Sequence, residues 1–190
     1  AARYNTDVER EKLLDVNKVL QEAAVAKSEG STRFCMGAAW REVKDNRDFD
    51  NVLEMVRGIN EMDMEVCCTL GMLNDEQAQR LKDAGLYAYN HNIDTSEEKY
   101  EDIISTRKFS DRLDTHKSVR KAGVSLCSGG IIGLGEEKKD RINMLITLAN
   151  YPKHPESVPI NTLVPVEGTP LAENDRVPSW DLIKMVSIAR

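Results

Sequence analysis

The chain alternates between segments with apolar residues at helical spacing and short apolar segments typical of strands. The helical pattern predicts helices over 6–30, 49–61, 74–85, 110–123, 138–150 and 180–190. The strands predicted between them are 31–36, 65–70, 86–92, 124–128 and 158–163. Thr6 followed by Glu9 predicts a capping box at the start of the first helix. Regular alternation of this kind predicts parallel βαβ units, in a doubly wound sheet or a (β/α)8 barrel.

The alternation of side chains within the predicted strands chooses between these two architectures. One face is apolar: Phe34, Met36, Val66, Cys68, Leu70, Tyr87, Tyr89, Val124, Leu126, Val158 and Ile160. The opposite face is Arg33, Cys35, Glu65, Cys67, Thr69, Asn90, Asn92, Asp94, Ser125, Cys127 and Asn161. A doubly wound sheet needs apolar residues on both faces, whereas a barrel that binds a polar ligand accepts this division. We therefore predict an α/β fold of the (β/α)8 TIM-barrel type, here a partial barrel of about five strands.

Composition and charge narrow the range of functions. The 190 residues are 41% hydrophobic and 31% charged, which is typical of a globular domain with its own core. The net charge is −6 without a Lys/Arg block, so neither a nucleic acid nor a membrane surface is expected as a partner. No apolar run approaches the roughly 18–20 residues of a membrane span, and no signal peptide is indicated. The four cysteines do not form the dense pattern of a small secreted scaffold, which favours a reducing cytosol. They contain no CxxC pair, which argues against a zinc ribbon or a thioredoxin-like site.

Three of the four cysteines fall on the polar face, near the carboxyl ends of their strands: Cys35, Cys67 and Cys127. Barrel enzymes place their chemistry at these ends. A single buried cysteine is ordinary, but three at matching heights on three strands favour a common ligand. Thiolates without a histidine favour an iron–sulfur cluster over zinc. Arg33 either holds such an anionic cluster or is an ordinary surface arginine.

Two further segments suggest ligand contacts. Asn90, Asn92 and Asp94 share one strand face and offer the donors and acceptors that bind a hydroxylated ligand such as a ribose. The alternative interpretation is an exposed strand end that runs into a turn. The glycine-rich segment 128–136 allows its backbone to approach a flat ligand closely, although it fits neither the Rossmann nor the Walker pattern.

Four segments together resemble the biotin synthase family of radical S-adenosylmethionine (SAM) enzymes. They are RFCMGAAW (33–40), YNHNIDT (89–95), CSGGIIGLGE (127–136) and PINTLV (159–164). The third also fits the GxIxGxxE motif on the adenine side of the wider superfamily. The resemblance covers residues 1–190 and implies one radical-SAM barrel domain, truncated at both ends. The implied enzyme is a sulfurtransferase that converts dethiobiotin to biotin. In it a [4Fe-4S] cluster cleaves SAM to a 5′-deoxyadenosyl radical, and a [2Fe-2S] cluster donates sulfur.

The resemblance also implies individual residue roles. Cys35, Cys67 and Cys127 match the cysteine ligands of the [2Fe-2S] cluster. The matches to SAM contacts are Asn92 and Asp94 at the ribose, Arg112 at the methionine carboxylate, the Ala38 backbone at the methionyl amine, and Ile131 at adenine. Asn161 matches a contact to dethiobiotin, to which Asn92 is also close. The implied partners are an electron donor such as flavodoxin or ferredoxin and a second copy in a homodimer. The implied location is the cytoplasm, or the mitochondrial matrix in a eukaryote.

Two parts of the family pattern are not found in the chain. The CxxxCxxC motif that binds the [4Fe-4S] cluster in the family is expected just ahead of Ala1. The arginine that serves as the fourth ligand of the [2Fe-2S] cluster is expected beyond Arg190. We therefore expect the chain to be a piece of a longer protein and to be inactive alone. Three alternatives stay open at this point. They are another radical SAM enzyme that forms C–S or C–C bonds, an ordinary barrel lyase or aldolase, and a binding barrel with structural cysteines.

Overall fold

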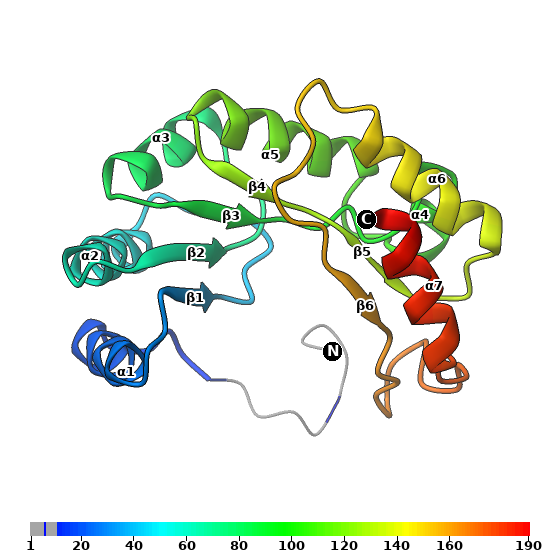
Figure 1. Ribbon diagram of the computed structural model, residues 1–190, viewed down its shortest axis with the longest axis horizontal. Helices are drawn as coiled ribbons and strands as arrows, with labels where there is room; N and C mark the ends of the chain where they lie inside the picture. Colours follow the sequence, from blue (N-terminus) through cyan, green and yellow to red (C-terminus); the bar gives the residue numbers. More distant parts are fainter. Residues whose placement is uncertain (1–5, 7–10) are drawn as a thin grey trace. The chain divides into compact units, whose positions relative to one another are not determined.

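The computed structural model describes residue 6 and residues 11–190 (Figure 1). The chain divides into two compact units. Residues 11–91 and 113–126 form the first, called here the β1–β4 unit, and the second, the β5–β6 unit, contains residues 92–112 and 127–190. The expectation of a single domain over 1–190 stays a prediction.

The β1–β4 unit is built on a sheet with the strand order β1-β2-β3-β4. The strands are β1 (Arg33–Gly37), β2 (Glu65–Thr69), β3 (Ala88–Asn90) and β4 (Ser125–Cys127), of which the last residue is counted in the β5–β6 unit. The helices are α1 (Val16–Ser28), α2 (Arg47–Glu61), α3 (Asp75–Asp83) and most of α5 (Phe109–Lys121). β1 pairs with β2 and β2 with β3 in parallel, and α1 packs on α2, which also contacts β2 and α3 (Figure 1).

Local signals explain where these helices begin. Asn46 caps α2 by accepting a hydrogen bond from the Phe49 amide at 3.1 Å, and Asn74 with Gln77 forms a capping box at the start of α3. The start predicted for the first helix is wrong. Thr6 lies outside any helix and Glu9 lies outside the described residues, whereas Asp15 caps α1 by accepting from the Asn17 amide at 2.9 Å.

The β5–β6 unit has two parallel strands, β5 (Gly130–Ile132) and β6 (Ile160–Thr162), with Ile131 opposite Asn161. Its helices are α4 (Glu97–Ile103), α6 (Lys138–Ala149) and α7 (Ser179–Ala189). All five predicted strands are found, but β5 and α4 are not among the predicted elements. Ser96 caps α4, where its Oγ accepts from the Lys99 amide at 3.3 Å, and Glu97 and Glu98 follow it.

Side-chain alternation holds within β2 and fails at both ends of β3. Val66 and Cys68 on β2 are fully buried, as predicted. Tyr87, predicted to share the apolar face of Tyr89, is 43% exposed, and the Arg33 guanidinium lies 4.9 Å from its ring centroid. The reason is that β3 begins only at Ala88, so the period of 2 does not extend to Tyr87. At its other end β3 stops at Asn90, and Asp94 has a φ of 68°, which breaks the predicted row of three polar side chains.

The predicted α/β fold with parallel strands is confirmed. Among the helices of residues 11–190, none is both long enough and apolar enough to cross a membrane.

Candidate functional site

In the β1–β4 unit, two of the predicted cluster ligands are direct neighbours. Cys35 on β1 and Cys67 on β2 are register partners in the parallel pair, and adjacent strands lie about 4.8 Å apart. Cys35 is exposed and Cys67 is 7% exposed. Cys68 is fully buried, and this burial raises the pKa of its thiol, so it acts as a small apolar residue. The structure thus separates Cys67 from Cys68 as the alternation predicts.

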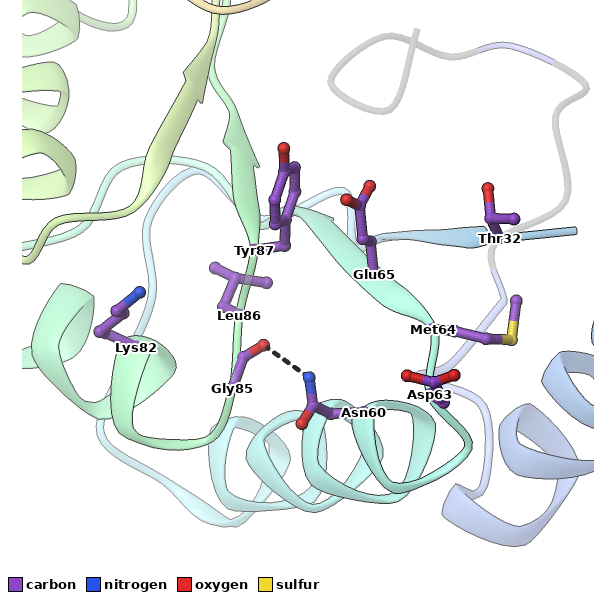
Figure 2. Close-up of a pocket in the computed structure, with 9 residues that line it drawn as sticks. All are labelled: Thr32, Asn60, Asp63, Met64, Glu65, Lys82, Gly85, Leu86 and Tyr87. Atoms are coloured by element: carbon purple, nitrogen blue, oxygen red, sulfur yellow. Dashed lines mark hydrogen bonds between the residues drawn. The ribbon is translucent and has the colours of Figure 1, made fainter.

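Arg33 lies one layer before the cysteine pair on the same face of β1. Its Nε and Nη2 donate to Oε2 of Glu65 at 2.8 and 2.6 Å, and this hydrogen bonding raises the pKa of Arg33. Figure 2 shows Glu65 and Tyr87 pointing the same way at the rim of a pocket of about 520 Å³. This pocket lies at the amino ends of β2 and β3, and none of the predicted site residues lines it. It is therefore separate from the chemistry expected at the carboxyl ends of the strands.

The loop that follows β1 carries the predicted backbone contact at Ala38. The Ala38 amide donates to the Thr69 carbonyl at 2.9 Å. An ammonium group only donates, so the Ala38 carbonyl is the backbone group that can accept from it. A pocket of about 470 Å³ in this unit is lined by residues that include Cys35, Ala38, Trp40 and Leu70. The loop thus places the Ala38 backbone and the Cys35 thiol on one cavity.

In the β5–β6 unit, residues 92–94 are tied to the glycine-rich segment by backbone and side-chain hydrogen bonds. The Asn92 Oδ1 accepts from the Gly129 amide at 3.1 Å, and the Ile93 amide donates to the Gly129 carbonyl at 3.0 Å. The Asp94 carbonyl accepts from the Ile131 amide at 2.7 Å. Ile131 is in turn the register partner of Asn161. The structure therefore brings together four of the residues predicted to contact a ligand: Asn92, Asp94, Ile131 and Asn161.

A charged cluster joins Asp94 to Arg112. The Arg112 Nη2 donates to the Asp94 Oδ2, and the Arg112 Nε donates to the Tyr100 hydroxyl at 3.0 Å. The side chains of Asp94 and Arg112 are only 15% and 11% exposed. Burial raises the pKa of Asp94, while the positive charge of Arg112 acts in the opposite direction. The structure thus brings together the two residues predicted at the ribose and at the carboxylate.

Glu136 fixes the glycine-rich segment. Its buried carboxylate accepts from the Gly133 amide at 2.8 and 3.1 Å and from the Arg141 Nε at 2.8 Å. Neither Glu136 nor Tyr100 is among the predicted site residues. The GxIxGxxE pattern contains the signal for Glu136, whereas nothing in the sequence pairs Tyr100 with Arg112.

Gly129 and Gly130 are packed closely by the protein itself, and the approach of this backbone to a flat ligand stays a prediction. A Cβ on Gly129 would lie 1.9 Å from the Pro159 carbonyl oxygen. A Cβ on Gly130 would lie 2.0 Å from the Met144 sulfur. Both glycines are therefore needed because the protein itself packs against them.

The third predicted cluster ligand, Cys127, ends β4 and forms a parallel bridge with Ser157 in the β5–β6 unit. In the part of the chain that the structure describes, no three His, Cys, Asp or Glu residues are grouped so that they can hold a metal ion. The three-cysteine ligand set therefore stays a prediction, of which the Cys35–Cys67 pair is the portion found together.

The sequence model of the Radical SAM superfamily matches residues 2–149, which is most of the chain. The chain belongs to the radical SAM superfamily. Its curated relatives include the biotin synthases of Cytophaga hutchinsonii, Christiangramia forsetii and Myxococcus xanthus, which are 64%, 62% and 61% identical over all 190 residues. The matched regions cover 56%, 52% and 55% of these relatives, so the chain spans about half of their length.

Two solved structures show the same fold as this chain. The HydG maturase of the [FeFe]-hydrogenase matches 97% of this chain and 44% of its own, with a TM-score of 0.80 and 18% identity. Methylornithine synthase matches 97% of this chain and 56% of its own, with a TM-score of 0.78 and 15% identity. The predicted fold class, a (β/α)8-type barrel of which part of the sheet is present, is confirmed.

Proposed function

We propose that this chain is part of a biotin synthase, which inserts sulfur into dethiobiotin to form biotin. The observation that carries the proposal is identity of 53–64% to biotin synthases across all 190 residues. Both units lie inside this region of identity. The likeness to HydG and methylornithine synthase, at 18% and 15% identity, supports the fold and not their reactions.

The polar cluster of the β5–β6 unit supports binding of SAM. Asp94 offers carboxylate oxygens to the ribose hydroxyls, and Arg112 offers a planar donor fork to the methionine carboxylate. Asn92 contributes its amide nitrogen at the ribose, since its Oδ1 accepts from Gly129. Ile131 contacts adenine, and the Ala38 carbonyl accepts from the methionyl amine. The tethering of Asp94 to Ile131 at 2.7 Å supports a site prepared before the ligand arrives.

The cysteine pair of the β1–β4 unit fits an iron–sulfur cluster, because thiolate sulfur is the donor that such clusters take from proteins. Cys35 and Cys67 would hold one side of a [2Fe-2S] cluster, with Cys127 as the third ligand. When bound, the [4Fe-4S] cluster supplies the electron that cleaves SAM, and the [2Fe-2S] cluster supplies the sulfur. The four cysteines of the chain do not include a CxxxCxxC, so no residue here is assigned to the [4Fe-4S] cluster.

Asn161 and Asn92 are proposed to orient dethiobiotin. Asn161 is exposed on β6 and is the register partner of Ile131, so the substrate would lie next to the adenine end of SAM. These two residues would act by positioning dethiobiotin, so that its reacting carbon lies close to the radical. The finer parts of the proposal are a flavodoxin or ferredoxin as electron donor, a homodimer, and a cytoplasmic location.

The proposal is tested on the intact protein after anaerobic reconstitution with iron and sulfide. We expect 5′-deoxyadenosine and biotin to form when SAM, dethiobiotin and a reductant are present. Formation of 5′-deoxyadenosine without biotin would indicate another radical SAM reaction and would contradict the proposal, as would the absence of both products from a protein loaded with both clusters.

Cys67→Ala and Cys68→Ala form a matched pair on neighbouring residues. Cys67→Ala is expected to lose the [2Fe-2S] absorption and the corresponding iron and sulfide, because one thiolate ligand is removed. Cys68→Ala is expected to keep them, because Cys68 is fully buried on the opposite face of β2. Equal cluster content in the two variants would contradict the assignment of Cys67.

A further inference from the structure

Tyr100 is a buried residue of α4 whose hydroxyl reaches the proposed SAM site. Its side chain is fully buried, and its ring lies edge-on to Phe109 with centroids 5.5 Å apart. The hydroxyl accepts from the Arg112 Nε at 3.0 Å. Burial raises the pKa of Tyr100, so its hydroxyl stays neutral throughout the working pH range. The ring is thus anchored by packing while the polar end faces the site.

The hydrogen bond from Nε to Tyr100 defines the orientation of Arg112. The Nε–H and one Nη2–H point in the same direction along one edge of the planar guanidinium. In this structure that edge is divided between two acceptors, the Tyr100 hydroxyl and the Asp94 carboxylate. Two fixed acceptors on one edge define the plane of the group, and the Tyr100 hydroxyl is one of these two.

We propose that Tyr100 is a positioning residue, which holds the Arg112 guanidinium in the plane that receives the carboxylate of SAM. This inference rests on the proposed function, in which Arg112 meets that carboxylate. A bidentate arginine–carboxylate contact requires the two groups to be coplanar, so its strength depends on the guanidinium plane more than on the charge. Tyr100 therefore affects the amino-acid end of the ligand and leaves the adenosine end unchanged.

The test compares two ligands on one conservative variant of the intact, reconstituted protein. SAM carries the carboxylate, whereas 5′-methylthioadenosine has the same adenine and ribose without it. Tyr100→Phe keeps the ring against Phe109 and removes only the hydroxyl. We expect the Kd for SAM to rise about tenfold, as for the loss of one hydrogen bond to a charged group, and the Kd for 5′-methylthioadenosine to stay within about twofold.

A double-mutant cycle with Arg112→Lys adds the second measurement. Lysine keeps the charge but has no planar fork, so Tyr100→Phe is expected to have no further effect on SAM binding in the Arg112→Lys background. Wild-type SAM affinity in Tyr100→Phe, equal weakening of both ligands, or additive effects in the cycle would each overturn the inference. Failure of the wild-type protein to bind SAM would instead overturn the proposed function.

Discussion

In the β1–β4 unit the proposed cluster ligands are placed by strand register, whereas in the β5–β6 unit the proposed SAM contacts are placed by single side chains. Cys35 and Cys67 face the same way because β1 and β2 pair over five successive residues. Asp94 is oriented by a left-handed backbone, by its hydrogen bond to Ile131 and by its ion pair with Arg112. A geometry shared among many equivalent bonds should tolerate the loss of one bond. A geometry that depends on a few contacts should not.

The largest expected effect is that of Gly129→Ala in the β5–β6 unit. The new Cβ would lie 1.9 Å from the Pro159 carbonyl oxygen, so the backbone must move. We expect a loss of about 3 kcal/mol in the free energy of unfolding, measured by urea denaturation of the intact protein, and weaker binding of SAM. The amide of Gly129 also donates to Asn92, so the same shift disturbs the ribose contact.

Gly37→Ala, on the last residue of β1, is the matched control. There the nearest atom to a new Cβ is the Thr69 carbonyl oxygen at 3.8 Å, which is an ordinary contact. Its unfolding free energy should stay within about 0.5 kcal/mol of the wild type. If the two variants were equally stable, the close packing of Pro159 on Gly129 would be refuted.

Tyr89→Phe tests a single side chain within the sheet-based unit. The Tyr89 hydroxyl accepts from the Leu70 amide at 3.2 Å and donates to the Gly71 carbonyl at 2.6 Å. Removing it leaves two backbone groups of the loop after β2 without this partner, so we expect a loss of about 1–3 kcal/mol in unfolding free energy. Because β1 and β2 keep their register, the [2Fe-2S] absorption should persist.

Tyr87→Phe provides the comparison two residues away. Tyr87 is 43% exposed and contacts Arg33 through its ring, which phenylalanine retains. We expect a change within about 0.5 kcal/mol, measured by the same urea denaturation. Loss of the cluster absorption in Tyr89→Phe but not in Tyr87→Phe would show that the cysteine pair also depends on a single side chain, through the Tyr89 hydroxyl.

The same difference between the units explains what could be predicted from the sequence. The opposite directions of Cys67 and Cys68 follow from a period of 2, and the structure buries Cys68 fully. Tyr87 was misplaced because this period applies only inside a strand, and β3 begins one residue later. The direction of a side chain that is set by strand register can therefore be predicted from the sequence wherever the ends of the strand are known.

The orientation of a side chain that is set by a few tertiary contacts cannot be predicted in the same way. The left-handed φ of Asp94 is uncommon for a residue other than glycine, and the sequence contains no sign of it. Tyr100 and Arg112 lie on two different helices, one of which has only seven residues and carries little apolar periodicity. Their hydrogen bond is a product of tertiary packing, as is the tight contact of Gly129 with Pro159. Resemblance to a family supplied Asp94 and Arg112, but not Tyr100, whose hydroxyl accepts from Arg112.

Apart from the control variants, the smallest expected effect is that of Asp75→Asn, which removes an exposed ion pair between α3 and α5. The Asp75 carboxylate accepts from the Lys121 ammonium and from the Ser118 hydroxyl, and the bond to Lys121 is the main cause of its lowered pKa. Because the folded pKa is below the unfolded value of about 3.9, the stabilisation is present above that pH and is lost as the pH falls through the folded pKa. Asp75→Asn should lower Tm slightly at pH 7, less than Tyr89→Phe, and the difference from the wild type should shrink as the pH falls through the lowered pKa of Asp75.

Asp114→Asn is the control for this exposed pair, because Asp114 pairs with Lys117 within one helix and joins no second element. Its effect on Tm at pH 7 should be smaller still, and added salt should reduce both effects. Should Asp75→Asn lower Tm as much as Tyr89→Phe, helix-to-helix contacts would be as important as the sheet in the β1–β4 unit. The contrast with the β5–β6 unit would then lie only in the site residues, and not in how the two units are held together.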